Sequence, residues 1–497
     1  MVNEGSVRSM NQRAVGAASV DTTTDHVVAS APSAERSDGS ITASERADGN
    51  RATAPLANWL PAVVLGGLTA VAMVRQGGFW HADAVVVAAG SLAVLLVAIA
   101  FGAVRLRWRK PEATVVVSLL LFDCWWLERA HAAGATTRFF PLGASVLGFA
   151  AAFACTRTLK SGQREVGACF VAILGASTAV AGLFGLVVRW DPLAIPSQYL
   201  WRLSGTVTYA NAAGLVLALG LVMALGMQRW PSVARASICL CIGGLIATQS
   251  RGPVLAFAAA CAFVPLDRYL RSLVPLAAGL ALGVAAVATS GSDGPVPLLA
   301  LVAVAALLVS VMWAPTVARR HPAPRQMIVA AVAVVVVAGC CAGLLQHQIA
   351  LRALTGDRSG EWSTGVAQFR AAPLVGVGAD QPLEFRAVDG SRAFFVHNEY
   401  LQITADAGVV GLALVAAIGV ALAMVVRRRD VLGSCAVAGL VCWALAAGVD
   451  FDWHLPVIGL MGGWLAGLAS ASGGPQPFTS AASEPPISGT IPTSNKE

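Results

Sequence analysis

The stretch YANAAGLVLALGLVMALGM, residues 209–227, contains no charged side chain. An α-helix rises about 1.5 Å per residue, so about 20 apolar residues cross the ~30 Å hydrocarbon core of a bilayer. Strands of a membrane barrel are shorter, and they alternate apolar with polar side chains, which this stretch does not do. It therefore predicts a transmembrane helix.

Similar apolar runs recur along the chain. Of its 497 residues, 56% are hydrophobic and 12% are charged, which is about half the charged fraction of a typical soluble domain. By hydropathy we place fourteen spans, at 57–74, 84–104, 112–127, 139–156, 166–188, 209–227, 236–250, 252–267, 273–290, 295–314, 327–345, 402–426, 431–448 and 455–472. The predicted fold class is an all-α membrane protein, a polytopic bundle of about 14 transmembrane helices.

The net charge of +7 does not indicate a nucleic-acid partner, because the basic residues are not gathered on one soluble face. They stand in short groups between the apolar runs, as in the cytoplasmic loops of membrane proteins. With the N-terminus in the cytoplasm, the inner loops hold 17 Lys and Arg and the short outer loops hold six. The sequence therefore predicts that both termini are cytoplasmic.

The two ends of the chain differ from the membrane domain, residues 56–473. Residues 1–55 and 474–497 are polar without an apolar period, so we expect disordered cytoplasmic tails. Residues 1–55 contain no apolar segment of the kind that a cleavable signal peptide needs. All ten cysteines fall in apolar runs without a CxxC or Cys/His spacing, so neither disulfides nor a metal site are expected.

One predicted outer loop, residues 346–401, is long and polar. Long loops without regular structure are uncommon in compact proteins and are usually functional. Trp362, Val366 and Phe369 follow the i, i+4, i+7 spacing of an apolar helical stripe, which Pro373 should end. We therefore expect this extracytoplasmic loop to carry short helices, one of them in the interface plane. An inert surface loop is the alternative.

Arg251 stands between two predicted spans in TQSRGPVLAF (248–257). A guanidinium so close to hydrocarbon is costly, and its paired N–H donors suit phosphate oxygens. Snorkelling to lipid headgroups is the alternative.

His397 lies where the long loop re-enters the membrane, so it could exchange a proton near neutral pH or act only as an interfacial hydrogen bonder. Asp450 and Asp452 stand in a very short outer loop. Two carboxylates at a membrane edge are costly unless they are paired, for example with arginine.

Several motifs follow one another along the second half of the chain: TYANAAGLV (208–216), SRG (250–252), DRSGEWSTGVAQFRAAPLVGVG (357–378), HNEYLQITADAGVVG (397–411) and DFDWHLP (450–456). In this order they resemble the O-antigen ligase/polymerase family of bacterial membrane glycosyltransferases. The resemblance covers roughly residues 205–460, the family-like core. The first four predicted spans resemble no family that we can identify.

The resemblance implies a GT-C-like, metal-independent glycosyltransferase of the bacterial cytoplasmic (inner) membrane that needs no cofactor. It would transfer a glycan from a polyprenyl-diphosphate carrier, such as undecaprenyl diphosphate, to an acceptor hydroxyl on the extracytoplasmic side. The acceptor would be a glycan, a glycolipid or a protein. The resemblance also implies roles for individual residues: diphosphate binding for Arg251 and Arg358, catalysis for His397 and Arg251, and support from Asn398, Asp450 and Asp452.

A transporter or flippase of lipid-linked glycan intermediates is the alternative function. Such proteins contain inverted repeats, and their ionisable residues lie near span centres. In this sequence we find no such repeat, and the ionisable residues gather at predicted span ends and in outer loops. This distribution favours chemistry at the membrane surface.

Overall fold

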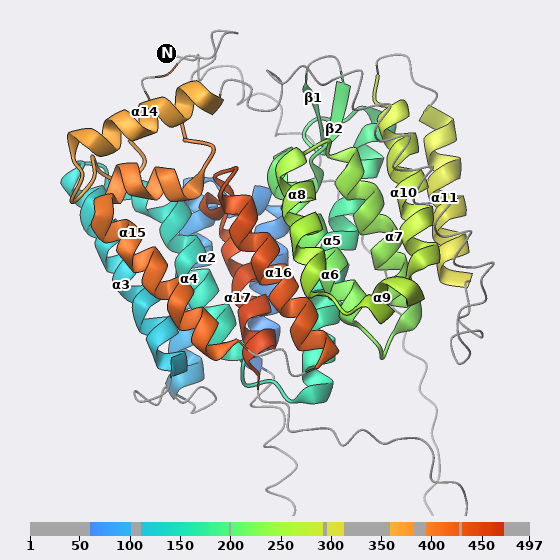
Figure 1. The fold of residues 1–497 in the computed structure, drawn as a ribbon, viewed down its shortest axis with the longest axis horizontal. Helices are drawn as coiled ribbons and strands as arrows, with labels where there is room; N and C mark the ends of the chain where they lie inside the picture. The colour runs from blue at the N-terminus through green and yellow to red at the C-terminus, as the bar shows by residue number, and fades with distance from the viewer. Residues whose placement is uncertain are drawn as a thin grey trace, which may run out of the picture. The chain divides into compact units, whose positions relative to one another are not determined.

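The computed structural model describes residues 60–100, 111–197, 200–291, 296–312, 358–381, 383, 385, 394–426 and 430–471. Across these residues the regular structure is helical, apart from one antiparallel pair of short strands, β1 (Ala194–Ser197) and β2 (Leu200–Leu203), which sets Ala194 opposite Leu203. The expectation of an all-α membrane protein is therefore confirmed (Figure 1).

The helices of the first half are Leu60–Val74, η1 (Gln76–Gly78), α2 (His81–Ala100), α3 (Pro111–Ala132), η2 (Thr136–Phe139), α4 (Phe140–Thr156), α5 (Ser161–Val188), η3 (Gly205–Val207) and α6 (Ala210–Gly226). Those of the second half are α7 (Pro231–Ala247), α8 (Arg251–Ala260), η4 (Cys261–Phe263), α9 (Leu266–Arg271), α10 (Leu273–Ala288), α11 (Val296–Met312), α14 (Arg358–Ala371), α15 (Glu399–Val425), α16 (Val431–Ala447), η5 (Asp452–His454) and α17 (Pro456–Ser470).

Each predicted span within the described residues falls on a helix. Four helical segments are both long and apolar enough to cross a bilayer: 81–100, 136–156, 161–188 and 399–425. Several other apolar helices, such as α6, have 10–17 residues. The count of fourteen is not confirmed, because span 327–345 lies outside the described residues, as do the two predicted tails.

Two predicted spans differ from the structure. The helix predicted at 252–267 ends at Phe263, because Pro265 cannot donate a helical hydrogen bond. Helix α3 continues to Ala132, beyond the predicted end at 127, so Asp123 lies in the middle of the helix and is buried. Ionisable residues are thus not confined to span ends.

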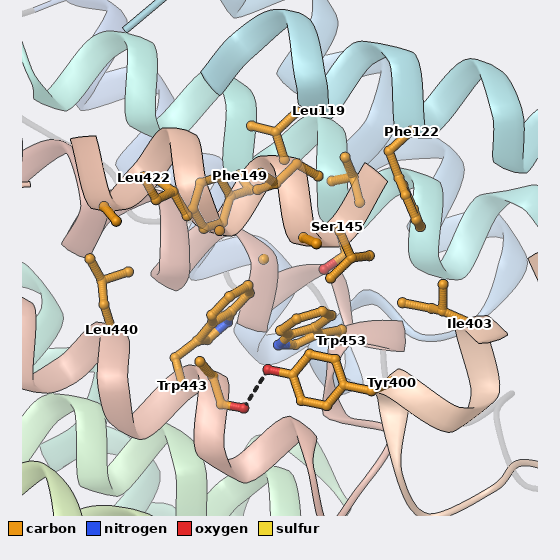
Figure 2. Close-up of a pocket in the computed structure, with 18 of the residues that line it drawn as sticks. Leu119, Phe122, Ser145, Phe149, Tyr400, Ile403, Leu422, Leu440, Trp443 and Trp453 are labelled. Atoms are coloured by element: carbon orange, nitrogen blue, oxygen red, sulfur yellow. Dashed lines mark hydrogen bonds between the residues drawn. The ribbon is translucent and has the colours of Figure 1, made fainter. Parts of the chain in front are cut away.

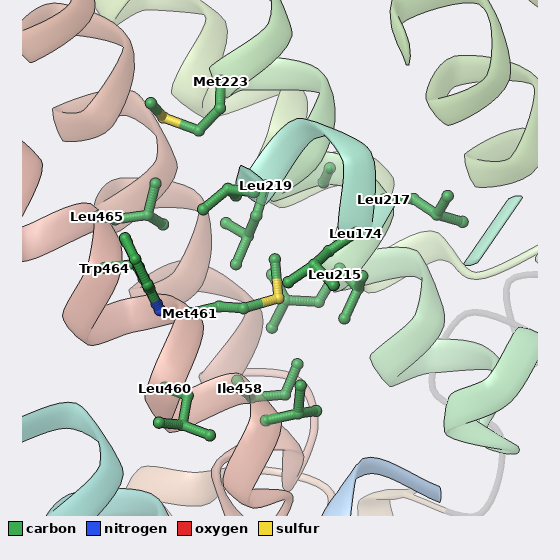
Figure 3. Packing of buried hydrophobic residues seen from close by; sticks show 14 of the residues in the cluster. Leu174, Leu215, Leu217, Leu219, Met223, Ile458, Leu460, Met461, Trp464 and Leu465 are labelled. Carbon is green, nitrogen blue, oxygen red and sulfur yellow. The ribbon is translucent and has the colours of Figure 1, made fainter. Parts of the chain in front are cut away.

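Helices α6 and α17 form the centre of the hydrophobic core. Every residue of α6 is buried, and so is every residue of α17 except its last. Figure 3 shows Leu219 and Met223 of α6 facing Met461 and Trp464 of α17. Protein therefore covers both helices on every side, and lipid does not reach them. These two helices therefore provide a rigid centre for the outer loops.

Helix α15 is broken at Gly408, whose φ of 67° and ψ of −165° are not helical. Its first part lies crosswise under α14, and its second part runs down the bundle (Figure 1). The segment after α14 fills the break, since the N–H of Val409 donates to Pro373 O at 2.9 Å. A side chain at Gly408 would overlap the backbone of Leu374, and one at Gly376 would overlap the backbone of Asp406.

Candidate active site

The candidate site lies where α14, the start of α15 and the loop before α17 meet. The N–H of Glu399 donates to Asp450 O at 3.0 Å, which ties α15 to that loop. Helix α14 confirms the short helix expected in the outer loop, and it ends at Ala371, two residues before Pro373. Trp362 anchors it by donating to His397 O at 3.2 Å.

Asp450 is buried and accepts hydrogen bonds from several elements. Its carboxylate accepts hydrogen bonds from Tyr209 Oη at 2.7 Å and from Asn211 Nδ2 at 2.5 Å, and both donors lie at the start of α6. Arg358, the first residue of α14, approaches it at 3.4 Å and donates to Val449 O at 2.5 Å. The expected pairing of an acidic residue of this loop with an arginine is therefore present, between Asp450 and Arg358.

Arg202 of β2 joins the same network through Asn211, whose Oδ1 accepts from Arg202 Nη2 at 2.9 Å and from Ser250 Oγ at 2.7 Å. Burial lowers the pKa of Arg202, and the positive charges of Arg358 and Arg251 lower it further. Asn211 also donates to Asp450, which pairs with Arg358, and a side chain at Gly252, the residue after Arg251, would come within 2.8 Å of Val449. The backbones that carry the three arginines therefore meet at this network. Arg251 is the exposed first residue of α8.

The His397 ring is oriented by Glu361 of α14. His397 Nδ1 lies 2.6 Å from Glu361 Oε2, and the backbone N–H of His397 donates to the same oxygen at 3.3 Å. The Glu361 side chain is 8% exposed and that of His397 is 27% exposed. Because a carboxylate only accepts, Nδ1 donates, and Nε2 of the neutral ring keeps its lone pair.

Asn398 and Glu399, the sequence neighbours of His397, have other partners. Asn398 caps α15 by accepting from Leu401 N at 3.0 Å. Glu399 is fully buried and faces His454, so neither residue holds the His397 ring. Asn398 supports the site only by fixing where α15 begins.

Asp452 is fully buried, and neither of its carboxylate oxygens has a hydrogen-bond partner among the described residues. Burial raises its pKa well above the usual value, and the charges of Asp450 and Glu399 raise it further. Asp452 thus lies beside the site without pairing to Arg251 or Arg358.

A second polar cluster lies beneath the site, around the fully buried His454. Its Nε2 is 2.9 Å from Asp380 Oδ1. Glu399 Oε1 lies 2.9 Å from its Nδ1, which is an ion-pair distance at an angle too poor for a hydrogen bond. Burial lowers the pKa of His454, but the charges of Glu399 and Asp380 outweigh burial, so the pKa lies well above its usual value. This cluster ties the outer loop to α15 and to η5.

An apolar groove of about 590 Å³ lies next to the site, lined by residues of α3, α4, α15 and α16. Tyr400 and Trp453 lie toward one end and Leu422 and Leu440 toward the other (Figure 2). Leu412, which also lines it, is 38% exposed, so the groove reaches the surface of the bundle. Tyr400, which lines the groove, directly follows Glu399, whose backbone N–H donates to Asp450 O.

The sequence analysis missed Glu361, Arg202 and Tyr209. Glu361 stands next to Trp362 in the expected stripe, and its place in the first turn of α14 is a signal that could have been used. Arg202 is one of the six basic residues of the predicted short outer loops, and no motif distinguishes it from the others. Among the described residues no cluster of His, Cys, Asp or Glu has the arrangement of a metal site.

Comparisons with known proteins bear on residues 236–416, which match the family model described as O-antigen ligase. This range contains Arg251, Arg358, Glu361 and His397. The match confirms the resemblance read from the sequence motifs. No curated protein matches the chain.

Proposed function

We propose that this chain, which belongs to the O-antigen ligase family, transfers a glycan from a polyprenyl-diphosphate carrier to an acceptor hydroxyl on the extracytoplasmic side. The observation that carries this proposal is one arrangement: a hydrogen-bonded network that joins Arg202 and Arg358 and reaches Ser250, the residue before Arg251, together with an oriented histidine and an adjacent apolar groove. Ligation and polymerisation both fit it.

The guanidiniums of Arg251 and Arg358 would bind the diphosphate, with Arg202 behind them. Arginine grips phosphate oxygens with paired N–H donors and keeps its charge at every relevant pH. Asp450 holds the Arg358 side chain in place from a buried position. Preorganised positive charge of this kind stabilises a leaving group on which negative charge develops.

The apolar groove would hold the first isoprene units of the carrier. Its lining is almost entirely carbon, and it reaches the bundle surface at Leu412, where a lipid chain can enter from the bilayer. Burying an apolar chain contributes about 25 cal/mol per Å². A lipid in the groove would carry its diphosphate toward the arginines near Tyr400.

His397 would act as the general base. The acceptor oxygen attacks the anomeric carbon of the donor and forms the new glycosidic bond, while the carbon–oxygen bond to phosphate breaks. The bonding electron pair leaves with the polyprenyl diphosphate, and the hydroxyl proton passes to His397 Nε2. Glu361 then faces an imidazolium and stabilises its charge. A base placed in this way contributes roughly 10²–10⁴-fold.

The test uses the full-length protein in liposomes with a fluorescent polyprenyl-diphosphate-linked glycan and a candidate acceptor. We expect donor consumption and labelled acceptor, both reduced in Arg358→Lys and unchanged in Arg370→Lys, an exposed arginine of the same helix. Movement of intact donor across the bilayer without consumption would instead support the flippase alternative and overturn the proposal.

A strain that lacks the protein then distinguishes ligation from polymerisation. Loss of attached surface polysaccharide with normal chain lengths would indicate ligation, whereas loss of long chains would indicate polymerisation. Either result identifies the acceptor class. The acceptor of a ligase is a molecule other than the donor glycan, whereas the acceptor of a polymerase is another copy of the glycan chain.

A further inference from the structure

A small aromatic pocket lies beside His397, outside the groove and the arginine cluster. Its volume is about 190 Å³, and its lining comes from three separate segments: Gln76, Phe79 and Trp80; Val207, Thr208 and Tyr209; Phe451 and Leu455. The loop carrying Trp80 is held against α17, since a side chain at Gly77 would come within 2.9 Å of Leu455.

We propose that this pocket binds one sugar ring of the acceptor, so that its hydroxyl is presented to His397. This inference rests on the proposed function, and it gives a role to the first outer loop, which the family resemblance leaves without one.

The pocket lies next to the proposed reacting groups, because its wall residue Phe451 also contacts His397. The Phe451 ring stacks on Tyr209 with centroids 5.2 Å apart, and its centroid is also 5.2 Å from that of His397. Tyr209 in turn donates to Asp450, which pairs with Arg358. A ligand against Phe451 and Tyr209 is therefore one side chain away from both the base and the diphosphate site.

The chemistry of the lining fits a neutral sugar. None of the eight lining residues is charged, so the pocket lacks the guanidinium and ammonium groups that favour a phosphate over a neutral ligand. Aromatic faces suit the C–H face of a pyranose, and the amide of Gln76 and the hydroxyl of Thr208 suit its hydroxyl groups. The pocket is also smaller than the ~300–1,000 Å³ sites that hold drug-sized ligands, so it takes a single ring.

Trp80 forms the exposed side of the pocket. Its side chain is 60% exposed, although its indole N–H donates to Gln76 and its ring packs edge to face against Phe79 at 5.7 Å. A large aromatic ring that is held in place but left exposed gains burial when a ligand covers it. Gln76, Phe79 and Trp80 also lie outside both the matched range 236–416 and the family-like core 205–460, as expected for a part that selects among acceptors.

The experiment measures acceptor and donor kinetics of Trp80→Ala together with direct binding of methyl hexopyranosides by saturation-transfer NMR. We expect the acceptor KM of Trp80→Ala to rise on the order of tenfold, with donor KM unchanged and the glycoside signal lost. Trp80→Phe should keep most of the binding. Trp190→Ala, at an outer-loop tryptophan that is 54% exposed, is the matched control and should change nothing.

Two results separate this inference from the proposed function. Normal acceptor KM and an undiminished glycoside signal in Trp80→Ala, with transfer intact, would overturn the pocket and leave the transferase. Glycoside binding that depends on Trp80, in a protein that transfers no glycan, would support the pocket as a sugar site and refute the transferase.

Discussion

Replacing Glu361 by glutamine isolates the charge that faces the His397 ring. The glutamine amide oxygen can still accept from Nδ1 at the place where Glu361 Oε2 now lies, 2.6 Å away. The ring therefore keeps its orientation, but an imidazolium formed during transfer loses its counter-charge. Glu361→Ala removes both the orientation and the charge, so the two variants separate these effects.

The size of the effect follows from the geometry. Hydrogen bonds to charged groups contribute about 1.5–3 kcal/mol, and each ~1.4 kcal/mol changes a rate tenfold. The Glu361 side chain is 8% exposed but that of His397 is 27% exposed, so water screens part of the interaction. We therefore expect the lower part of that range: a fall in kcat of about tenfold for Glu361→Gln, and more for Glu361→Ala.

The assay is single-turnover transfer from a labelled donor in liposomes, with donor binding measured on the same preparations. Donor affinity should not change, because the arginines are intact. Glu128→Gln is the matched control, since the Glu128 side chain is 51% exposed and far from His397 in the sequence. A kcat for Glu361→Gln equal to that of the unmodified protein would refute the role assigned to the carboxylate.

Four further predictions follow. Arg251→Lys keeps the charge but loses the planar fork, so the donor Kd should rise on the order of tenfold; unchanged binding would mean that Arg251 only snorkels. His397→Ala should lower the transfer rate at least tenfold without affecting donor binding, and lost donor binding would reassign it to the phosphates. The pKa of His454 is raised in the folded protein, so the stability it provides is complete below about pH 6.5 and is lost as the pH rises through the higher folded value. The Tm measured against pH should therefore fall above neutrality, and His454→Gln should flatten that slope. Reporter fusions at Arg109 should indicate the cytoplasm and fusions at Ala387 the outside, and the reverse would undo the predicted orientation.

Much of the fold could be predicted from the sequence because bilayer thickness sets the length of an apolar run. That argument located the helices, yet it could not find the break in α15 at Gly408. The break depends on a backbone contact with Pro373, which is 35 residues earlier in the chain, and hydropathy carries no information about it.

The site was predictable only in part, for a related reason. Arg251, Arg358 and His397 stand in motifs that can be read locally, and they do gather at one end of the bundle. The partners of these residues come from elsewhere: Glu361 reaches His397 across 36 residues, and Asn211 reaches Asp450 across 239. Glu399, two residues after His397 in the sequence, instead faces the buried His454.

Gly408, at the break in α15, and Gly376, in the segment after α14, allow these two segments to pack in direct backbone contact. Gly376 leaves room for the backbone at Asp406, and Gly408 leaves room for the backbone at Leu374. The two segments therefore pack backbone against backbone, each at a position where the other has no side chain. A displacement of the segment after α14 would therefore move the first part of α15, which carries Glu399. If the proposed substrate displaces α14 when it binds, the buried pair of Glu399 and His454 would respond to that binding.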